Sequence, residues 1–412
     1  MKQLLQLRLY SAGMEIQTKI TQAHFSILLA CFIMATIAWG TVFYGHSVYL
    51  DAFTRFGSWK TQQITTAILI FWFSSLPGTL SIGYLIDSKG PFSIITLGAL
   101  FIGLALIGLG QATELWQIFM CYALMGFAYP AIGAAGISAT LAPHFSKNFG
   151  LALGIALTGA SLGGALIPFC IIFFIGAVGF KTTTLVLGLS VLVVLFCLSI
   201  LFQYKTPKSV SKQAAKIKDQ HFQFHILRKP IFWRIAIAAA LGLGGQVGFL
   251  AHQIPIVADK VDQLSAAFTV SVVAISAAIG RILIAFVSRH ISVNKLAAAS
   301  YFIQGTGIAY IIFAETFSMI VVACSIAGFV VGGIVMLPPM LIRNAFGSFS
   351  YGKNYAMANV VLYIFAGIGP WLVGVAHGST NSYTLGLSGL VFSQLIAAIM
   401  ISRPIVLPKT SL

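Results

Sequence analysis

Acidic side chains are scarce in this chain. Only 8 of its 412 residues are Asp or Glu, and charged residues of both signs make up 8% of the sequence. Soluble domains carry about 25% charged residues, so this composition excludes a typical water-soluble protein. Because 58% of the residues are hydrophobic and the mean hydropathy is +0.96, we expect an all-α protein that is integral to the bilayer and crosses it many times.

Catalytic and metal-binding patterns are also missing. The sequence shows no nucleophile–base pair, phosphate-binding loop or metal-ligand spacing, so we expect neither an enzyme nor a cofactor. The cysteines have no CxxC spacing and fall in apolar segments, which indicates small buried side chains rather than disulfides or metal ligands. They are Cys31, Cys121, Cys170, Cys197 and Cys324.

Long apolar segments follow one another along the chain, and each is long enough to span the bilayer as a helix. Twelve are expected, at residues 25–50, 61–86, 93–111, 116–142, 150–176, 182–203, 230–258, 264–288, 294–314, 318–342, 354–377 and 381–402. The sequence therefore predicts an N-terminal region (1–24), a first six-helix bundle (25–203), a basic linker (204–229), a second bundle (230–402) and a tail (403–412).

The basic residues indicate the orientation of these helices. With both termini inside, 19 of the 24 Lys and Arg lie on the cytoplasmic side and four on the opposite side. This bias is typical of membrane topology and argues against a nucleic-acid partner, despite the formal charge of +16. We expect a monomer in a bacterial plasma membrane, with both termini and the linker in the cytoplasm.

The remaining cation, Arg281, has no other ionisable side chain around it in residues 264–288. A charge at the centre of a membrane helix costs about 2.5–3.5 kcal/mol, so such residues usually have a function or reach an interface. Arg281 lies about 10 Å from the end of its segment, which a long side chain can partly bridge. Substrate binding and snorkelling are therefore both open interpretations.

The acids do not neutralise this charge in the sequence-based topology, since all eight fall in loops or at segment ends. A bound anion would supply the missing negative charge, and arginine suits a bidentate grip on a carboxylate. One fixed cation favours a monoanion over a dianion.

Intramembrane proton carriers are usually carboxylates or histidines. Only His46 and His252 qualify here, each in the outer half of its helix. Either could carry a coupling proton, since histidine titrates near neutrality. The alternative for both is a hydrogen-bonded or interfacial histidine.

Weak internal repetition is visible. Pro168 and Pro370 each follow small residues and are separated by close to half the chain, as a duplicated six-helix unit would leave them. Small residues four apart also predict close helix packing. These pairs are Gly159/Gly163 and Gly328/Gly332.

The loop after the second segment reads GYLIDSKG and contains Gly83, Asp87 and Gly90. In a twelve-helix chain with a basic central linker, this motif resembles the major facilitator superfamily. The resemblance implies two six-helix bundles and a cytoplasmic latch between them at these three residues. Phe92 stands where the family usually has a basic residue.

Further stretches resemble the monocarboxylate and oxalate/formate branch of that family. They are FGSWKTQQI (56–64), MGFAYPAIG (125–133), GLALGIALTGASLGG (150–164), GRI (280–282), RNAFG (343–347) and GIGPWLVG (367–374). The resemblance implies that Arg281 binds a substrate carboxylate and that Tyr129 lines the cavity, although packing is the alternative for Tyr129. Ala277 stands where animal members have an aspartate, and Tyr44 and His46 lie near the level of their missing helix 1 lysine.

Gln246, Asn359 and Tyr363 are polar residues on the helices expected to line that cavity, and are further binding candidates. We therefore predict a secondary transporter of a small organic anion, most simply a monocarboxylate, that works by symport or antiport. Export of drugs, transport of a carboxylate-type siderophore and a membrane sensor without turnover are the alternatives.

Overall fold

The structure is a computed structural model that describes residues 24–57, 59–141, 144–145, 149–205, 224–288, 290–346 and 351–403. Within these ranges the chain is helical and contains no strand. Eleven helices in the described residues are long and apolar enough to cross a membrane. The expected all-α membrane fold is confirmed. The expected segment that is not among these eleven, 61–86, is the start of a longer helix whose side chains are not described from residue 82 to 92.

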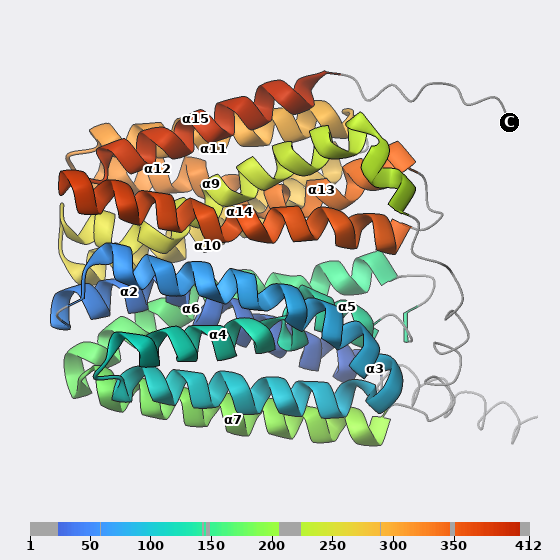
Figure 1. Ribbon diagram of the computed structural model, residues 1–412, viewed down its shortest axis with the longest axis horizontal. Coiled ribbons are helices and arrows are strands. Elements are labelled where there is room, and N and C mark those ends of the chain that lie inside the picture. The colour runs from blue at the N-terminus through green and yellow to red at the C-terminus, as the bar shows by residue number, and fades with distance from the viewer. Residues whose placement is uncertain are drawn as a thin grey trace, which may run out of the picture.

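Two groups of helices lie one above the other in Figure 1, and they correspond to the two halves of the sequence. The first half contains a helix at 24–37, a π-helix η1 (Ala38–Phe43), α2 (Gly45–Phe56), α3 (Thr61–Gln111), α4 (Leu115–Ile132), α5 (Ala134–Leu141), α6 (Phe149–Val178) and α7 (Phe180–Lys205). The second contains η3 (Phe224–Arg228), α9 (Pro230–Ala258), α10 (Gln263–Val287), α11 (Val293–Phe313), α12 (Phe317–Phe329), α13 (Val331–Phe346), α14 (Tyr351–Thr380) and α15 (Thr384–Ser402).

Helix α3 reverses direction within its length and so supplies two of the expected segments. Gly78 and Ser81 line the same small cavity as Ile94 and Gly98, whereas a straight helix would separate Gly78 from Gly98 by about 30 Å. Figure 1 shows the bend. The first arm (residues 61–81) and the second arm (residues 93–111) therefore form separate crossings.

Corresponding helices of the two halves begin at positions that differ by the same number of residues. We call this difference in residue number the repeat offset. It relates the starts of α3 and α10 (61 and 263), of α4 and α12 (115 and 317), and of α6 and α14 (149 and 351). The repeat offset also relates Pro168 to Pro370, which occupy equivalent positions in α6 and α14, two helices of equal length. This agreement supports the duplicated six-helix unit that the two prolines predict.

Three expected segments are interrupted rather than continuous. The first becomes π-helical at Ala38–Phe43 and then continues to Phe56, six residues beyond the expected end. The segment expected at 116–142 breaks at Gly133, three residues after Pro130, and its counterpart at 318–342 breaks at Val330. Proline removes an intrahelical hydrogen bond and π-helical turns often mark functional sites.

The two halves meet mainly through α2 with α9, α3 with α14, and α6 with α10. We call the end that carries residues 57–60, 112–114, 259–262, 314–316 and 381–383 the outer end. In the part of the chain that is described, the inner segments α5 and α13 do not pack on the opposite half to a comparable extent. The halves are thus joined towards the outer end.

Glycines allow the closest helix contacts. A Cβ at Gly159 or Gly163 of α6 would collide with the carbonyl groups of Phe32 and Thr36 in the first helix. The second predicted pair, Gly328 and Gly332, packs against α10 in the same way. Both predicted small-residue pairs therefore lie at helix contacts.

Gly163→Ala is expected to lower the thermal unfolding midpoint of the purified protein, because overpacking at a close contact costs about 1–3 kcal/mol. Gly154→Ala on the same helix is the matched control, since no atom lies within 4 Å of a Cβ there. Alanine is the better helix former, so the control should be neutral or slightly stabilised. Equal midpoints for the two variants would contradict this packing.

Candidate functional site

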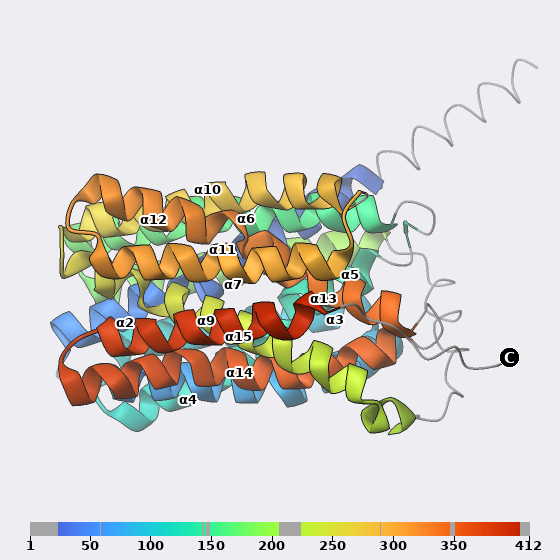
Figure 2. The ribbon, with the colours of Figure 1, turned by 90° about the horizontal axis from the view of Figure 1, so that it is seen from above.

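Arg281 lies on α10 with its guanidinium directed at the other half of the protein. Its Nη1 donates a hydrogen bond of 2.8 Å to the carbonyl oxygen of Leu157 on α6. Figure 2 shows α6 and α10 running alongside each other. This is the innermost of the hydrogen bonds described between the two halves, and it places the charge at their interface.

A single backbone carbonyl does not neutralise a guanidinium, which carries five N–H donors and a full charge. None of the ion pairs found among the described residues includes Arg281. The side chain is partly buried, and its one described hydrogen bond leaves the other donors without a carboxylate of the described residues. The arrangement suits an anionic ligand, as the sequence predicts.

Tyr44 lies at the junction of η1 and α2, where the first helix changes geometry. Its ring packs directly on Gly164 of α6. Leu157 and Gly164 are about 10 Å apart along α6. Helix α6 therefore brings Tyr44 and Arg281 to one region between the halves.

Trp72, on the first arm of α3, is the centre of an aromatic cluster. Its ring centroid lies 5.3 Å from that of Tyr363 and 6.4 Å from that of Tyr129. Trp39 packs on Tyr129 at 6.1 Å, and the ring of Tyr44 packs on Phe43, which packs on Trp72. Because Tyr363 belongs to the second half and the others to the first, this aromatic cluster crosses the interface.

The polar atoms of this cluster lack partners. The Trp72 Nε1 is buried without an acceptor, and no hydrogen bond involves the hydroxyls of Tyr44, Tyr129 or Tyr363 in the described residues. The structure thus brings the three predicted tyrosines together. It adds Trp39 and Trp72, which belong to no quoted motif and which apolar periodicity alone does not distinguish from packing residues.

The two remaining polar candidates occupy different surroundings. Gln246 on α9 is fully buried, and both of its amide atoms lack a partner. Asn359 is half-buried on α14, one turn before Tyr363 and on the same face. No contact of either residue with Arg281 is described, so their role in binding stays a prediction.

Neither candidate histidine contacts Arg281. His46 is 1% exposed, lies between the rings of Phe71 and Tyr122, and has no partner for either nitrogen. His252 donates from Nε2 to the carbonyl oxygen of Pro370 at 3.0 Å. Both lie inside helix bundles, and their part in proton coupling remains untested.

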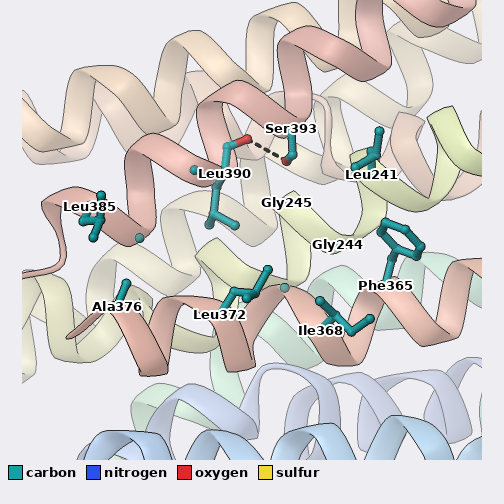
Figure 3. Close-up of a pocket in the computed structure, with 13 residues that line it drawn as sticks. Leu241, Gly244, Gly245, Phe365, Ile368, Leu372, Ala376, Leu385, Leu390 and Ser393 are labelled. Atoms are coloured by element: carbon teal, nitrogen blue, oxygen red, sulfur yellow. Dashed lines mark hydrogen bonds between the residues drawn. The ribbon is translucent and has the colours of Figure 1, made fainter. Parts of the chain in front are cut away.

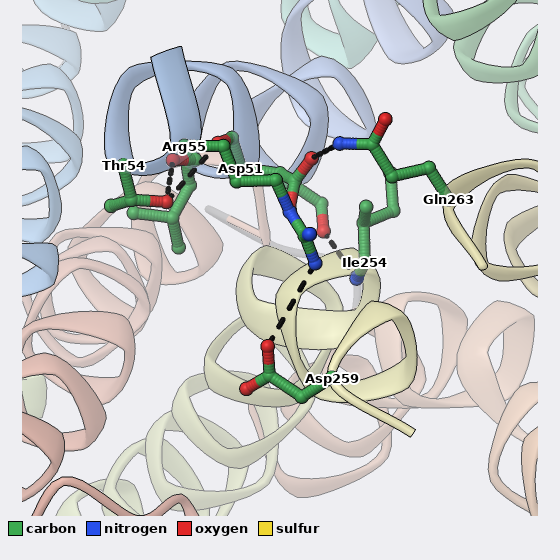
Figure 4. A network of polar contacts seen from close by, with 8 residues as sticks. Asp51, Thr54, Arg55, Ile254, Asp259 and Gln263 are labelled. Carbon is green, nitrogen blue, oxygen red and sulfur yellow. Dashed lines mark hydrogen bonds and ion pairs between the residues drawn. The ribbon is translucent and has the colours of Figure 1, made fainter. Parts of the chain in front are cut away.

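Asp51 corrects the expectation that all acids fall in loops or at segment ends. Since α2 continues to Phe56, this carboxylate lies within a helix and is 4% exposed. Its Oδ1 accepts from Arg55 Nε at 2.7 Å and its Oδ2 from Gln263 Nε2 of the second half at 2.9 Å. Arg55 also reaches Asp259 at 3.8 Å, as Figure 4 shows.

We call Asp51, Arg55, Asp259 and Gln263 the outer network. It holds α2 against the junction of α9 and α10 at the outer end, where Ser47 also accepts a bond of 2.8 Å from the backbone N–H of Ile254. Asp51 and Arg55 are four residues apart, and this spacing is the feature of the sequence that could have indicated a helical ion pair.

Gly83, Asp87 and Gly90, the predicted latch, are helical residues of α3 whose side chains lie outside the described part of the chain. Other expectations fall on residues that are not described at all. These are the N-terminal region up to residue 23, most of the linker and the tail from residue 404.

A separate apolar cavity of about 220 Å³ lies between α9, α14 and α15 (Figure 3). Leu372 and Leu390 line it, and the hydroxyl of its Ser393 is already bonded to the Leu390 carbonyl at 2.8 Å. Arg281 and the tyrosines are not among its lining residues. The cavity offers no cation and does not fit the predicted anion.

Comparison with known proteins identifies the family. The model of the Major Facilitator Superfamily matches residues 27–370. The agnestins efflux protein AgnL12 of Paecilomyces divaricatus is 31% identical over 208 residues, which are 49% of this chain and 45% of that protein. The MFS-type transporter hasB of Aspergillus fumigatus is 33% identical over 151 residues, 34% of this chain and 31% of its own.

A bacterial relative covers more of the chain. The uncharacterized MFS-type transporter YhjX of Escherichia coli is 24% identical over 308 residues, which are 71% of this chain and 75% of that protein. The alignments thus span less than half of the two fungal relatives. The family match supports the expectation of a transporter rather than an enzyme, and none of these three names specifies a carboxylate.

Asp51→Asn is expected to weaken closure of the outer end, because the amide keeps the size of the side chain but removes its charge from the outer network. Spin labels at Gln111→Cys and Phe313→Cys, both exposed at that end, would measure the separation of the halves in a protein without the five native cysteines. The distance distribution should shift to longer values.

Asp262→Asn is the matched control, since its carboxylate bonds only Ser265 of its own helix and asparagine caps a helix equally well. This variant should reproduce the native distances. Unchanged distances in Asp51→Asn would show that the outer network does not hold the halves together.

Proposed function

The chain belongs to the major facilitator superfamily, and we propose that it is a secondary transporter that moves a small organic anion by alternating access. The proposed cargo is a monocarboxylate, and the proposed location is a bacterial plasma membrane with both termini in the cytoplasm. Transporter-named relatives in bacteria and fungi support the transport activity. The carboxylate assignment depends on this chain's own residues.

The observation that carries the proposal is the position of Arg281. Its charge lies at the interface between the halves, hydrogen-bonded to a carbonyl and to no carboxylate of the described residues. A carboxylate ligand would replace Leu157 with a stronger, charge-assisted partner. Tyr44 and Tyr129, whose hydroxyls have no partner among the described residues, are the proposed neutral donors to the same anion.

Binding at this position would affect the arrangement of the halves. The bond from Arg281 to Leu157 joins α10 to α6, so an anion that takes over the guanidinium removes one contact of the present conformation. A ligand shifts a conformational equilibrium only through such differential contacts. The contacts towards the outer end, including the outer network, fit a conformation that is closed on that side.

Proton coupling, if present, would use buried titratable groups away from Arg281. His46 and His252 remain the candidates from the sequence, and Asp51 joins them because it lies buried between the halves. Symport would require such a group to hold its proton while the anion is bound, and antiport would require it to release the proton when the anion binds.

Efflux is the second candidate, and the name of one relative favours it. AgnL12 is an efflux protein by name and is 31% identical over half of this chain. Export of a larger anion would use the same Arg281 but require more space between the halves. A sensor without turnover would bind an anion yet give no counterflow, which separates it from both transporters.

Arg281→Lys is expected to reduce counterflow of labelled monocarboxylates in proteoliposomes at least tenfold. Lysine keeps the charge but loses the planar fork that binds a carboxylate through two bonds. The measurement compares acetate, lactate and benzoate as labelled substrates, at equal amounts of reconstituted protein.

Arg228→Lys, at an exposed residue of η3, is the control for the same chemical change and should transport normally. Thermal unfolding of both variants checks their folding. Native rates in Arg281→Lys would exclude Arg281 as the anion ligand, and an absence of counterflow for all three substrates in the native protein would contradict the proposed cargo.

A further inference from the structure

The duplicated architecture gives two equivalent interfaces between the halves, α3 with α14 and α10 with α6. Under the repeat offset, Leu69 corresponds to Ser271 and Gly367 to Ala165. Both pairs are in contact: the Ser271 hydroxyl donates to the Ala165 carbonyl, and Leu69 packs on Gly367. The two interfaces are therefore comparable residue by residue.

Their side chains differ in size and charge. In the α3–α14 interface Trp72 packs on Tyr363, with ring centroids 5.3 Å apart. The repeat offset assigns Ala274 to the position of Trp72 and Ser161 to that of Tyr363. One interface is thus aromatic, while the other carries small side chains on the helices that also hold Arg281 and Leu157.

Buried polar atoms without partners lie on α6, α3 and α9, three of the helices through which the halves meet. Ser161 is 7% exposed and its hydroxyl has no hydrogen bond. The same is true of Trp72 Nε1, on a side chain that is 3% exposed, and of both amide atoms of Gln246, the counterpart of Tyr44 under the repeat offset. Buried polar groups normally have partners, so each of these side chains is free to bind a polar ligand.

We infer that the transported anion carries an aromatic ring, so that the substrate class is an aromatic monocarboxylate. The inference rests on the proposed function, because Arg281 must hold the carboxylate. The ring then lies against Trp72 and Tyr363. The equivalent positions of the other interface carry the small residues Ala274 and Ser161. Trp72, Tyr129 and Tyr363 are the residues that determine this specificity.

Ring chemistry explains why an aromatic body is favoured over an aliphatic one of similar size. Aromatic pairs with centroids about 4.5–7 Å apart gain stability beyond their buried area when they stack with an offset or edge to face. The corresponding gain in affinity is roughly two- to tenfold for each ring contact. Two contacts give an expected preference of about tenfold.

The test compares binding of benzoate, cyclohexanecarboxylate and acetate to the purified full chain by calorimetry. Benzoate and cyclohexanecarboxylate share charge and approximate size, and differ in the aromatic ring. Native protein is expected to bind benzoate about tenfold more tightly than cyclohexanecarboxylate, and acetate most weakly. Arg281→Ala should lose all three.

Trp72→Leu should lower the preference for benzoate from about tenfold to about threefold, because the contact with Tyr363 remains, and should leave binding of cyclohexanecarboxylate nearly unchanged. Trp116→Leu is the matched control, since Trp116 is 62% exposed on α4, and should keep the preference. Tyr363→Leu provides a second, less buried position if Trp72→Leu fails to fold. The comparison of the three acids on the native protein does not depend on the folding of any variant.

The possible failures are distinct. Equal affinities for benzoate and cyclohexanecarboxylate, both lost in Arg281→Ala, overturn the aromatic inference and leave the carboxylate transporter intact. A benzoate preference that keeps its native value in both Trp72→Leu and Tyr363→Leu also overturns it. No Arg281-dependent binding of any of the three acids contradicts the proposed function itself.

Discussion

The charge of Arg281 is the constraint on which the account of function depends. It lies between the two halves of a membrane protein, and no carboxylate of the described residues pairs with it. A guanidinium in this position is costly to place in a membrane helix, and its one described bond is to the carbonyl of Leu157. A structural arginine would be expected to have an acidic partner, as Arg55 has in Asp51. The contrast between these two arginines, one paired and one unpaired, distinguishes the outer network from the candidate binding site.

Duplication explains how such a site arises between the halves. Six-helix units related by the repeat offset place equivalent helices at both interfaces, so the backbone frame is nearly the same on the two sides. Function then depends on the positions at which the two halves carry different side chains under the repeat offset. Arg281 and Thr79 occupy matching positions, as do Tyr44 and Gln246, and each pair differs in charge or in ring character. The α3–α14 interface is therefore aromatic, and the α6–α10 interface carries small side chains and one cation.

The sequence predicts the fold well because membrane helices are local features. Composition, the lengths of apolar runs and the distribution of Lys and Arg need no knowledge of tertiary contacts, and Arg281 is conspicuous for the same reason. Boundaries are less predictable: the first segment extends past residue 50, and this places Asp51 in a buried helical interface rather than at a loop. The aromatic cluster was only partly foreseen. Its members come from both halves of the chain, and Trp72 has no local signal that separates a ligand wall from a packing residue.

The most direct test of the central claim is a crystal structure of the native protein with 4-bromobenzoate, located by the anomalous scattering of bromine. The account predicts a ligand between the halves, with its carboxylate on the Arg281 guanidinium and the bromine peak beside the rings of Trp72 and Tyr363. A bromine peak in the apolar cavity between α9, α14 and α15, with Arg281 still bonded only to Leu157, would contradict it.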